Sequence, residues 1–237
     1  MTETSPPHAV RAPSGTVAAD HARLAAAALA RRPLDRAMLA AFAECVRGGG
    51  AGEGPGGGAR AVADLGCGPG RITAHLDGLG VRAFGVDLSP AMVAVARRTY
   101  PGLRFEVGSM AALDVADGVL GGVLAWNSTV HTPPPQLPAF FAEFARVLAP
   151  GGHALIAFRT GEATGGATGE ARVLPRPATA SSAAPDVHRA PPDRIAGLLA
   201  AAGLAEVARL VREPDAGECS PQGFLLARRA RGDAPAG

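Results

Sequence analysis

AVADLGCGPGR, residues 61–71, is the most informative stretch of this chain. A short apolar run comes first, and three glycines follow at alternate positions: Gly66, Gly68 and Gly70. Residues 72–79 then continue with the pattern of a helix. Glycine tolerates backbone conformations that other residues resist, and the unpaired N–H groups at a helix start attract an electron-rich partner. The stretch therefore predicts a strand, a tight turn and a helix start that together hold a nucleotide-like cofactor.

The chain beyond this turn alternates between apolar runs and amphipathic stretches. Strands are expected at 61–65, 82–86, 103–107, 119–126 and 153–158, and helices at 72–79, 89–100, 136–148 and 191–202. Ser89 and Pro90 suit the N-cap and the first position of the helix at 89–100. Two late strands, 205–211 and 223–227, predict an antiparallel hairpin at one sheet edge. This order predicts an α/β fold with a doubly wound, mostly parallel sheet.

The sequence divides into an N-terminal segment, a pair of helices with a linker, and a main domain that contains an insertion. Residues 1–15, rich in Pro, Ser and Thr, are expected to be disordered. Residues 16–58 are expected to hold helices at 17–30 and 34–46 and a glycine-rich linker; the second helix places on one face Leu34, Met38, Leu39 and Phe42. The main domain covers 59–230, and its insertion at 160–190 reads as a mobile surface loop more readily than as an ordered substrate lid.

Composition narrows the class of protein. The length of 237 residues suits one substantial domain, and 47% of the residues are hydrophobic against 19% charged. All 23 basic residues are arginines, which are scattered rather than gathered in a basic stripe, so we expect no nucleic-acid partner. Cys45, Cys67 and Cys219 are far apart and have no CxxC or His-rich spacing, which predicts neither a disulfide framework nor a metal site.

The N-terminal sequence MTETSPPHAVRAPSG lacks the basic start and apolar middle of a signal peptide. No apolar run approaches the roughly 20 residues that a membrane span needs. We therefore expect a cytoplasmic protein without a membrane partner.

Two acidic residues and one arginine bear on which cofactor the turn holds. Asp87 ends the second strand, where both dinucleotide sites and methyl-donor sites place an acid that accepts hydrogen bonds from ribose. Arg71 stands where the dinucleotide fingerprint GxGxxG has its third glycine, which disfavours that class. Asp64 could face the ammonium group of a methionine-derived cofactor, directly or through water, or could only brace the turn.

Four blocks of sequence, in order, resemble the class I S-adenosylmethionine-dependent methyltransferases, in particular small stand-alone bacterial ones of types 11 and 25. The blocks are ADLGCGPG at 63–70, GVDLSPAMVAVAR at 85–97, FEVGSMAALD at 105–114 and RVLAPGG at 146–152. The resemblance covers about 60–230. It implies a Rossmann-like sheet of seven strands in the order 3-2-1-4-5-7-6, with the last strand antiparallel and the N-terminal helices as a cover.

The resemblance also implies roles for particular residues. Gly66, Cys67 and Gly68 would line the methionine portion of S-adenosylmethionine, and Asp87 would hold its ribose. Where many members carry an acid near the adenine amino group, this chain has a serine, which hydrogen-bonds less strongly. The full set of expected cofactor contacts is Asp64, Gly66, Cys67, Gly68, Gly70, Asp87, Leu88, Met92, Ser109, Met110, Trp126 and Asn127.

The segment AWNSTVHTPP, 125–134, follows the fourth strand, where such sheets meet cofactor and substrate. Trp126 and Asn127 are candidates to contact the cofactor, and a core position is the alternative for the tryptophan. His131 is the candidate general base, because an imidazole near neutral pH can take a proton from a nucleophile. The alternative for it is a surface histidine in a Pro-rich loop.

A few further residues are expected near the substrate. His21 lies in the N-terminal cover, and His188, Arg189 and Arg194 lie on the substrate side. Arg212 is equally suited to a structural ion pair.

The sequence as a whole predicts an S-adenosylmethionine-dependent methyltransferase that acts on an oxygen, nitrogen or carbon atom of a small molecule. The alternatives are an NAD(P)-dependent oxidoreductase and a non-catalytic protein that binds S-adenosylmethionine.

Overall fold

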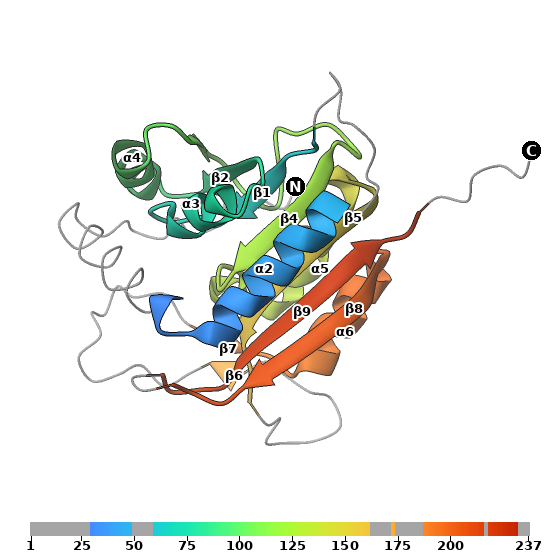
Figure 1. Cartoon of the computed structure of the whole chain (residues 1–237). Coiled ribbons are helices and arrows are strands. Elements are labelled where there is room, and N and C mark those ends of the chain that lie inside the picture. Colours follow the sequence, from blue (N-terminus) through green and yellow to red (C-terminus); the bar gives the residue numbers. More distant parts are fainter. Residues whose placement is uncertain (1–28, 49–58, 162–171, 174–186, 216–217, 232–237) are drawn as a thin grey trace, which may run out of the picture.

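Parallel strands form the centre of a seven-stranded sheet in the order β3-β2-β1-β4-β5-β9-β8 (Figure 1). The computed structural model describes residues 29–48, 59–161, 172–173, 187–215 and 218–231. The strands of the sheet are β1 Val62–Leu65, β2 Ala83–Asp87, β3 Arg104–Val107, β4 Leu120–Trp126, β5 Leu148–Arg159, β8 Leu204–Arg212 and β9 Gln222–Arg229. Only β9 runs against the others, pairing antiparallel with both β5 and β8. The expected doubly wound sheet, its strand order and its antiparallel last strand are confirmed.

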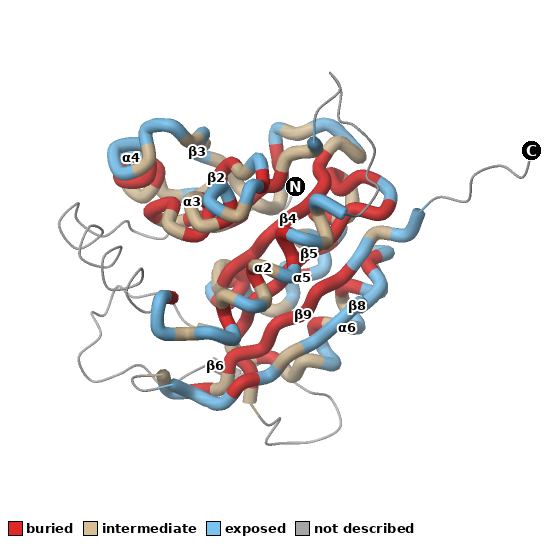
Figure 2. The backbone as a smooth tube through the Cα atoms, viewed as in Figure 1, coloured by how far each residue is buried: buried red, intermediate tan, exposed pale blue. Residues whose placement is uncertain are grey.

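The central strands are apolar because helices cover both faces of the sheet. Every residue of β1 and of β4 is buried, as expected for parallel strands in the middle of a doubly wound sheet. Figure 2 shows this burial continuing along β9, whereas the outermost strand β8 is mostly exposed. The well-covered centre gives the strand ends around β1 and β4 a rigid frame.

Two helices, α2 Pro33–Gly48 and α3 Arg71–Gly78, pack on one face of the sheet. α2 approaches β4 closely, since a Cβ atom on Gly122 would lie 2.8 Å from the Phe42 ring. The core on this face is made by side chains that include Leu39, Phe42, Val62, Leu76, Leu124, Leu155 and Phe224. The N-terminal helix therefore covers the sheet from one side, as expected.

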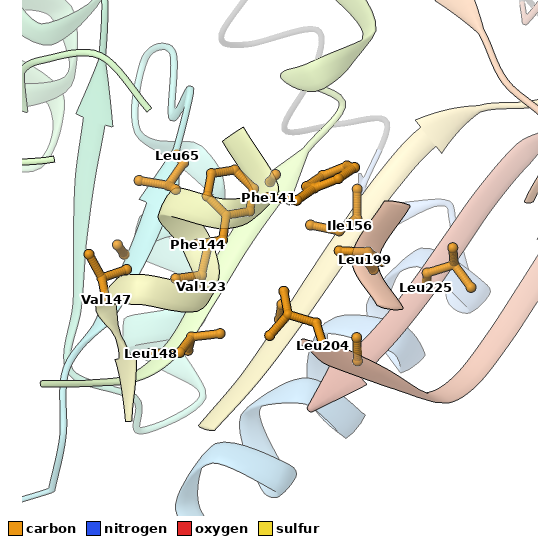
Figure 3. Close-up of a cluster of buried hydrophobic side chains, with 14 of the residues drawn as sticks. Leu65, Val123, Phe141, Phe144, Val147, Leu148, Ile156, Leu199, Leu204 and Leu225 are labelled. Atoms are coloured by element: carbon orange, nitrogen blue, oxygen red, sulfur yellow. The ribbon is translucent and has the colours of Figure 1, made fainter. Parts of the chain in front are cut away.

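The opposite face is covered by α5 Leu137–Val147 and α6 Pro192–Ala201. Figure 3 shows the aromatic and aliphatic side chains that fill this core, among them Phe141, Phe144, Val123, Ile156, Leu199 and Leu225. A further helix, α4 Pro90–Thr99, packs against β2 and β3. Its N-cap is Ser89, whose hydroxyl accepts from the Met92 backbone N–H, as predicted.

Two expectations about these elements were wrong in detail. Leu34 is 45% exposed and Asp35 beside it is buried, because Asp35 forms an ion pair with Arg212 in the interior. The fifth strand begins at Leu148 rather than 153, since β5 already pairs with β4 through Leu148 and Leu120. Helix α5 consequently passes into β5 without a loop.

The insertion at 160–190 contributes two short strands, β6 Arg172–Val173 and β7 His188–Arg189, which pair antiparallel. The N-terminal segment 1–15 and the glycine-rich linker at 48–58 lie outside the described residues, except that Gly48 ends α2. Residues 17–28 of the first expected helix and most of the insertion also lie outside them. Among the described residues, no helix is both long and apolar enough to cross a membrane.

Candidate functional site

The glycine turn joins β1 to α3, and each of its three glycines has a positive φ. The φ angles are 71° at Gly66, 55° at Gly68 and 84° at Gly70. A Cβ atom on Gly66 would lie 2.3 Å from the Cβ of Ser128, and one on Gly70 would lie 2.6 Å from the Phe105 ring. A Cβ atom on Gly68 would meet nothing within 4 Å. Gly66 and Gly70 are thus packing positions, and Gly68 is where the main chain faces open space.

Asp87 ends β2 beside this turn. One of its carboxylate oxygens accepts from the Gly68 backbone N–H at 2.8 Å, and the other accepts from the Ser89 N–H at 2.8 Å. Asp87 as a whole residue is half-buried. The Asp87 carboxylate therefore holds the glycine turn in place, and its oxygens still have lone pairs that can accept from a hydroxyl group.

Asp64 lies in β1, two residues before the first glycine of the turn, and is 1% exposed. Burial raises its pKa to about 6, although the Thr73 hydroxyl donates to the carboxylate at 2.7 Å and the charge of Arg71 favours ionisation. Burial also lowers the pKa of Arg71. The hydrogen bond to α3 supports the bracing interpretation of Asp64. The raised pKa shows in addition that a nearby cation would be favourable to this carboxylate.

The carboxyl end of β4 supplies polar atoms close to the turn. Among the described residues, Asn127 is the only non-glycine with a positive φ, 54°. The side-chain oxygens of Asn127 and Ser128 are buried, and neither has a hydrogen-bond partner in the described part of the chain. Buried polar groups are normally hydrogen-bonded, so the Ser128 hydroxyl beside Gly66 and the Asn127 oxygen next to it in sequence are candidate contacts for a polar ligand.

The residues expected at an adenine ring lie beyond Asp87. Leu88 is 59% exposed, which is unusual for a leucine next to a buried strand, and Met92 is half-buried on α4. The Met110 methyl group lies 3.2 Å from the position of a Cβ on Gly66. The Ser109 hydroxyl accepts from the Ala111 N–H at 3.2 Å. The structure thus gathers these residues around the end of β2 and the glycine turn.

Two of the expected contacts have side chains that point into cores. Cys67 packs with Val93, Ala96 and Phe105, where burial raises the pKa of its thiol, so only its backbone faces the turn. Trp126 is 8% exposed, and its ring centroid lies 5.3 Å from that of Phe224. The Trp126 ring therefore occupies a core position, which was the alternative expected for it. Only its backbone could contact a ligand.

The histidine and arginine candidates are spread over several elements. His131 is exposed at the end of η1 Thr129–His131, in keeping with the surface alternative, whereas His188 and Arg189 form β7. Arg194 is exposed on α6, and His21 lies outside the described residues. Arg212 is the structural ion-pair partner, bound to Asp35 at 2.7 Å and to Glu218 at 2.5 Å.

Sequence reasoning missed two residues of this site. Thr73 occupies a fully buried position of α3 between apolar neighbours, and a polar residue on such a face is a signal of a specific partner. Ser128 gave no comparable signal, because its proximity to Gly66 depends on how β1 and β4 pair. In the described part of the chain, no group of three or more His, Cys, Asp or Glu side chains could hold a metal ion.

Part of this chain matches a known protein family. Residues 62–152 match the model of a family described as a methyltransferase domain. Over this segment the chain is therefore similar to methyltransferases. The matched segment includes the glycine turn, Asp87 and the end of β4.

Two curated relatives match part of this chain. Trans-aconitate 2-methyltransferase of Methylobacterium nodulans is 38% identical over 97 residues, which are 38% of this chain and 35% of that protein. Demethylmenaquinone methyltransferase of Chlorobaculum parvum is 34% identical over 96 residues, covering 40% and 39%. The chain therefore aligns with less than half the length of either relative.

Solved structures share the fold of this chain over a longer range. An S-adenosylmethionine-dependent methyltransferase of Methanosarcina mazei has a TM-score of 0.62 at 18% identity, covering 72% of this chain and 92% of that one. The 1,6-didemethyltoxoflavin N1-methyltransferase of Burkholderia thailandensis, solved with bound 1,6-didemethyltoxoflavin and S-adenosylhomocysteine, has a TM-score of 0.61 at 21% identity, covering 96% of this chain and 93% of that one. At these identities the likeness is one of fold.

Proposed function

We propose that the chain is an S-adenosylmethionine-dependent methyltransferase that transfers a methyl group to an oxygen, nitrogen or carbon atom of a small molecule. The observation that carries the proposal is the open main chain at Gly68, whose N–H is held by the carboxylate of Asp87. The names of the relatives add support, since trans-aconitate and 1,6-didemethyltoxoflavin are small molecules.

The residues around the turn fit this cofactor in chemical character. It has ribose hydroxyls for Asp87, an ammonium group for the buried carboxylate of Asp64, and an apolar ring for the exposed side chain of Leu88. The orphaned oxygens of Asn127 and Ser128 would face its methionine portion. The remaining contacts would come from the backbone of Gly66, Cys67, Gly68, Gly70 and Trp126 and from Met92, Ser109 and Met110.

When bound, S-adenosylmethionine supplies a methyl group on a sulfonium, which is already a strong methyl donor. The protein then has little covalent chemistry to perform. Its residues align the acceptor atom for an in-line attack and keep water away, and holding two reactants in this way is a large contribution to rate. Asp64 and Asp87 serve this alignment by fixing the two polar ends of the cofactor.

His131 is proposed as a general base for acceptors that must lose a proton. Its support is its place on η1, which directly follows Asn127 and Ser128 at the end of β4. Its exposure gives a proton taken from the acceptor a route to water.

Calorimetric titration with S-adenosylhomocysteine tests the proposal in the wild type and in Asp87→Asn. Hydrogen bonds to a charged group contribute roughly 1.5–3 kcal/mol, so the variant is expected to bind about 10- to 100-fold more weakly. The matched control is Asp77→Asn, an exposed acid on α3, which should bind like the wild type. Absence of binding to the wild type, or equal affinity of Asp87→Asn, contradicts the proposal.

A further inference from the structure

Thr73 is the one polar side chain on the buried face of α3. The other buried residues of this helix are Ile72 and Leu76. Burying a hydroxyl group is unfavourable unless it forms a hydrogen bond, so its partner indicates what the position is for. Thr73 Oγ1 donates to Asp64 Oδ2 at 2.7 Å. The hydroxyl group of Thr73 therefore serves the carboxylate of Asp64.

The Asp64 carboxylate has acceptor positions beyond those that Thr73 uses. Both the hydroxyl and the backbone N–H of Thr73 donate to it, whereas two carboxylate oxygens can together accept about four hydrogen bonds. Its neighbours across the sheet are Gly85 on β2 and Leu124 on β4. Neither has a side chain that can donate a hydrogen bond, so the adjacent strands do not occupy the remaining positions.

The charges that act on Asp64 belong to the glycine turn and its flanks. Arg71 at the start of α3 favours its ionisation, and Asp87 at the end of β2 opposes it. The charge of Asp64 in turn raises the pKa of the Cys67 thiol within the turn. The carboxylate is thus close enough to the turn to act on a charged group that binds there. After burial, the hydrogen bond from Thr73 has the largest influence on the pKa of Asp64, and it favours the ionised form.

We propose that Thr73 is a positioning residue for the cofactor: it holds the Asp64 carboxylate ionised and oriented, so that its free acceptor positions receive the ammonium group of S-adenosylmethionine. The inference rests on the proposed methyltransferase function. An ammonium group binds an ionised carboxylate more strongly than a neutral carboxyl group. Binding of the cofactor should therefore depend on pH, and the Thr73 hydroxyl should set the range.

The direction of this pH dependence follows from the hydrogen bond. The pKa of Asp64 is about 6, and a ligand that needs the ionised form loses affinity about tenfold for each pH unit below that value. Removing a hydrogen bond to a charged group raises the pKa further, by about one unit or more. A variant without the hydroxyl should therefore lose the cofactor at a pH where the wild type still binds it.

Calorimetric titration with S-adenosylhomocysteine at several pH values from about 5 to about 8 tests the proposal. Thr73→Val keeps the branched shape and removes the hydroxyl group, whereas Thr73→Ser keeps the hydroxyl. We expect Thr73→Val to bind about 10-fold more weakly than the wild type at the acid end and nearly equally at the alkaline end. Thr73→Ser should follow the wild type throughout.

Two controls separate positioning from a merely structural role. Thr99→Val makes the same substitution on α4, where Thr99 Oγ1 donates to the Val95 carbonyl at 2.9 Å, and it should bind like the wild type. Asp64→Asn removes the titrating group. Its affinity should not change over this pH range, and adding Thr73→Val to it should have little further effect.

The proposal is overturned if Thr73→Val binds like the wild type at every pH, or more weakly by the same factor at every pH. The wild type and Asp64→Asn decide the matter even if Thr73→Val does not fold. An affinity of the wild type that is independent of pH, or the same pH dependence in Asp64→Asn, also overturns the proposal. Failure of S-adenosylhomocysteine to bind the wild type at any pH would instead contradict the proposed function.

Discussion

Asp64 is a carboxylate whose ionised form is unfavourable in the folded chain. Burial raises its pKa from 3.8 to about 6, so the folded state holds a proton that the unfolded state releases at lower pH. The wild type therefore loses stability from this group as the pH rises from about 3.8 to beyond 6. Under the proposed function, the ammonium group of the cofactor would lie near Asp64 and would favour its ionised form.

Asp64→Asn should accordingly stabilise the protein at high pH and weaken cofactor binding. We expect its gain in the free energy of unfolding to grow from roughly 1 kcal/mol at pH 4.5 to roughly 3 kcal/mol at pH 8. Urea unfolding of both proteins at several pH values measures the difference. A difference that stays constant with pH would show that Asp64 does not titrate as described.

The glycines of the turn should respond differently to the same substitution. Gly66→Ala combines a left-handed φ with a 2.3 Å approach to Ser128, and should destabilise by roughly 3 kcal/mol. Gly68→Ala should lower the free energy of unfolding by only about 1 kcal/mol, the cost of the left-handed φ, because a Cβ atom there would meet nothing within 4 Å. Both should lose S-adenosylhomocysteine binding. Equal stability of the two variants in urea would contradict this division between packing and ligand-facing glycines.

At the scale of elements, a buried ion-pair cluster fastens the N-terminal helix to the far edge of the sheet. Arg212 of β8 contacts Asp35 of α2 and Glu218, which precedes β9, and all three side chains are less than 10% exposed. Removing the arginine leaves two carboxylates buried without their main partner, which is more costly than losing a surface pair.

Arg212→Met should lower the free energy of unfolding by about 3–5 kcal/mol. Arg209→Met is the matched control, since Arg209 lies on the same strand and pairs with Glu206 and Asp193 at the surface. Its effect should be much smaller, because exposed pairs are screened by solvent. Comparable losses for the two variants in urea would refute the structural role of the cluster.

The elements were predictable from sequence where local signals determined them. Ser89 and Pro90 placed the start of α4, and the glycine turn placed the junction of β1 and α3. Leu34 was wrongly expected on the buried face of α2, where Asp35 lies instead. Asp35 is buried because it pairs with Arg212, which is 177 residues away in the sequence. The early start of β5 likewise depends on pairing with β4.

At the scale of the whole molecule, the residues around the glycine turn were far more predictable than a recess beside η1. Asp64 and Asp87 lie on two adjacent parallel strands, and the glycines form the turn that follows the first strand, so a local pattern locates them. That recess, lined by residues such as Val130, Phe158, His188 and Ile195, is instead assembled from η1, β5, β7 and α6, which meet only in the folded chain. No residue spacing in the sequence therefore indicates the recess.

The central claim is that the glycine turn binds a methyl donor rather than a dinucleotide. The most direct measurement is calorimetric titration of the wild-type protein with S-adenosylhomocysteine and, in parallel, with NADH. We predict saturable binding of S-adenosylhomocysteine and none of NADH, because Arg71 occupies the position of the third dinucleotide glycine. Saturable binding of NADH with none of S-adenosylhomocysteine would contradict it.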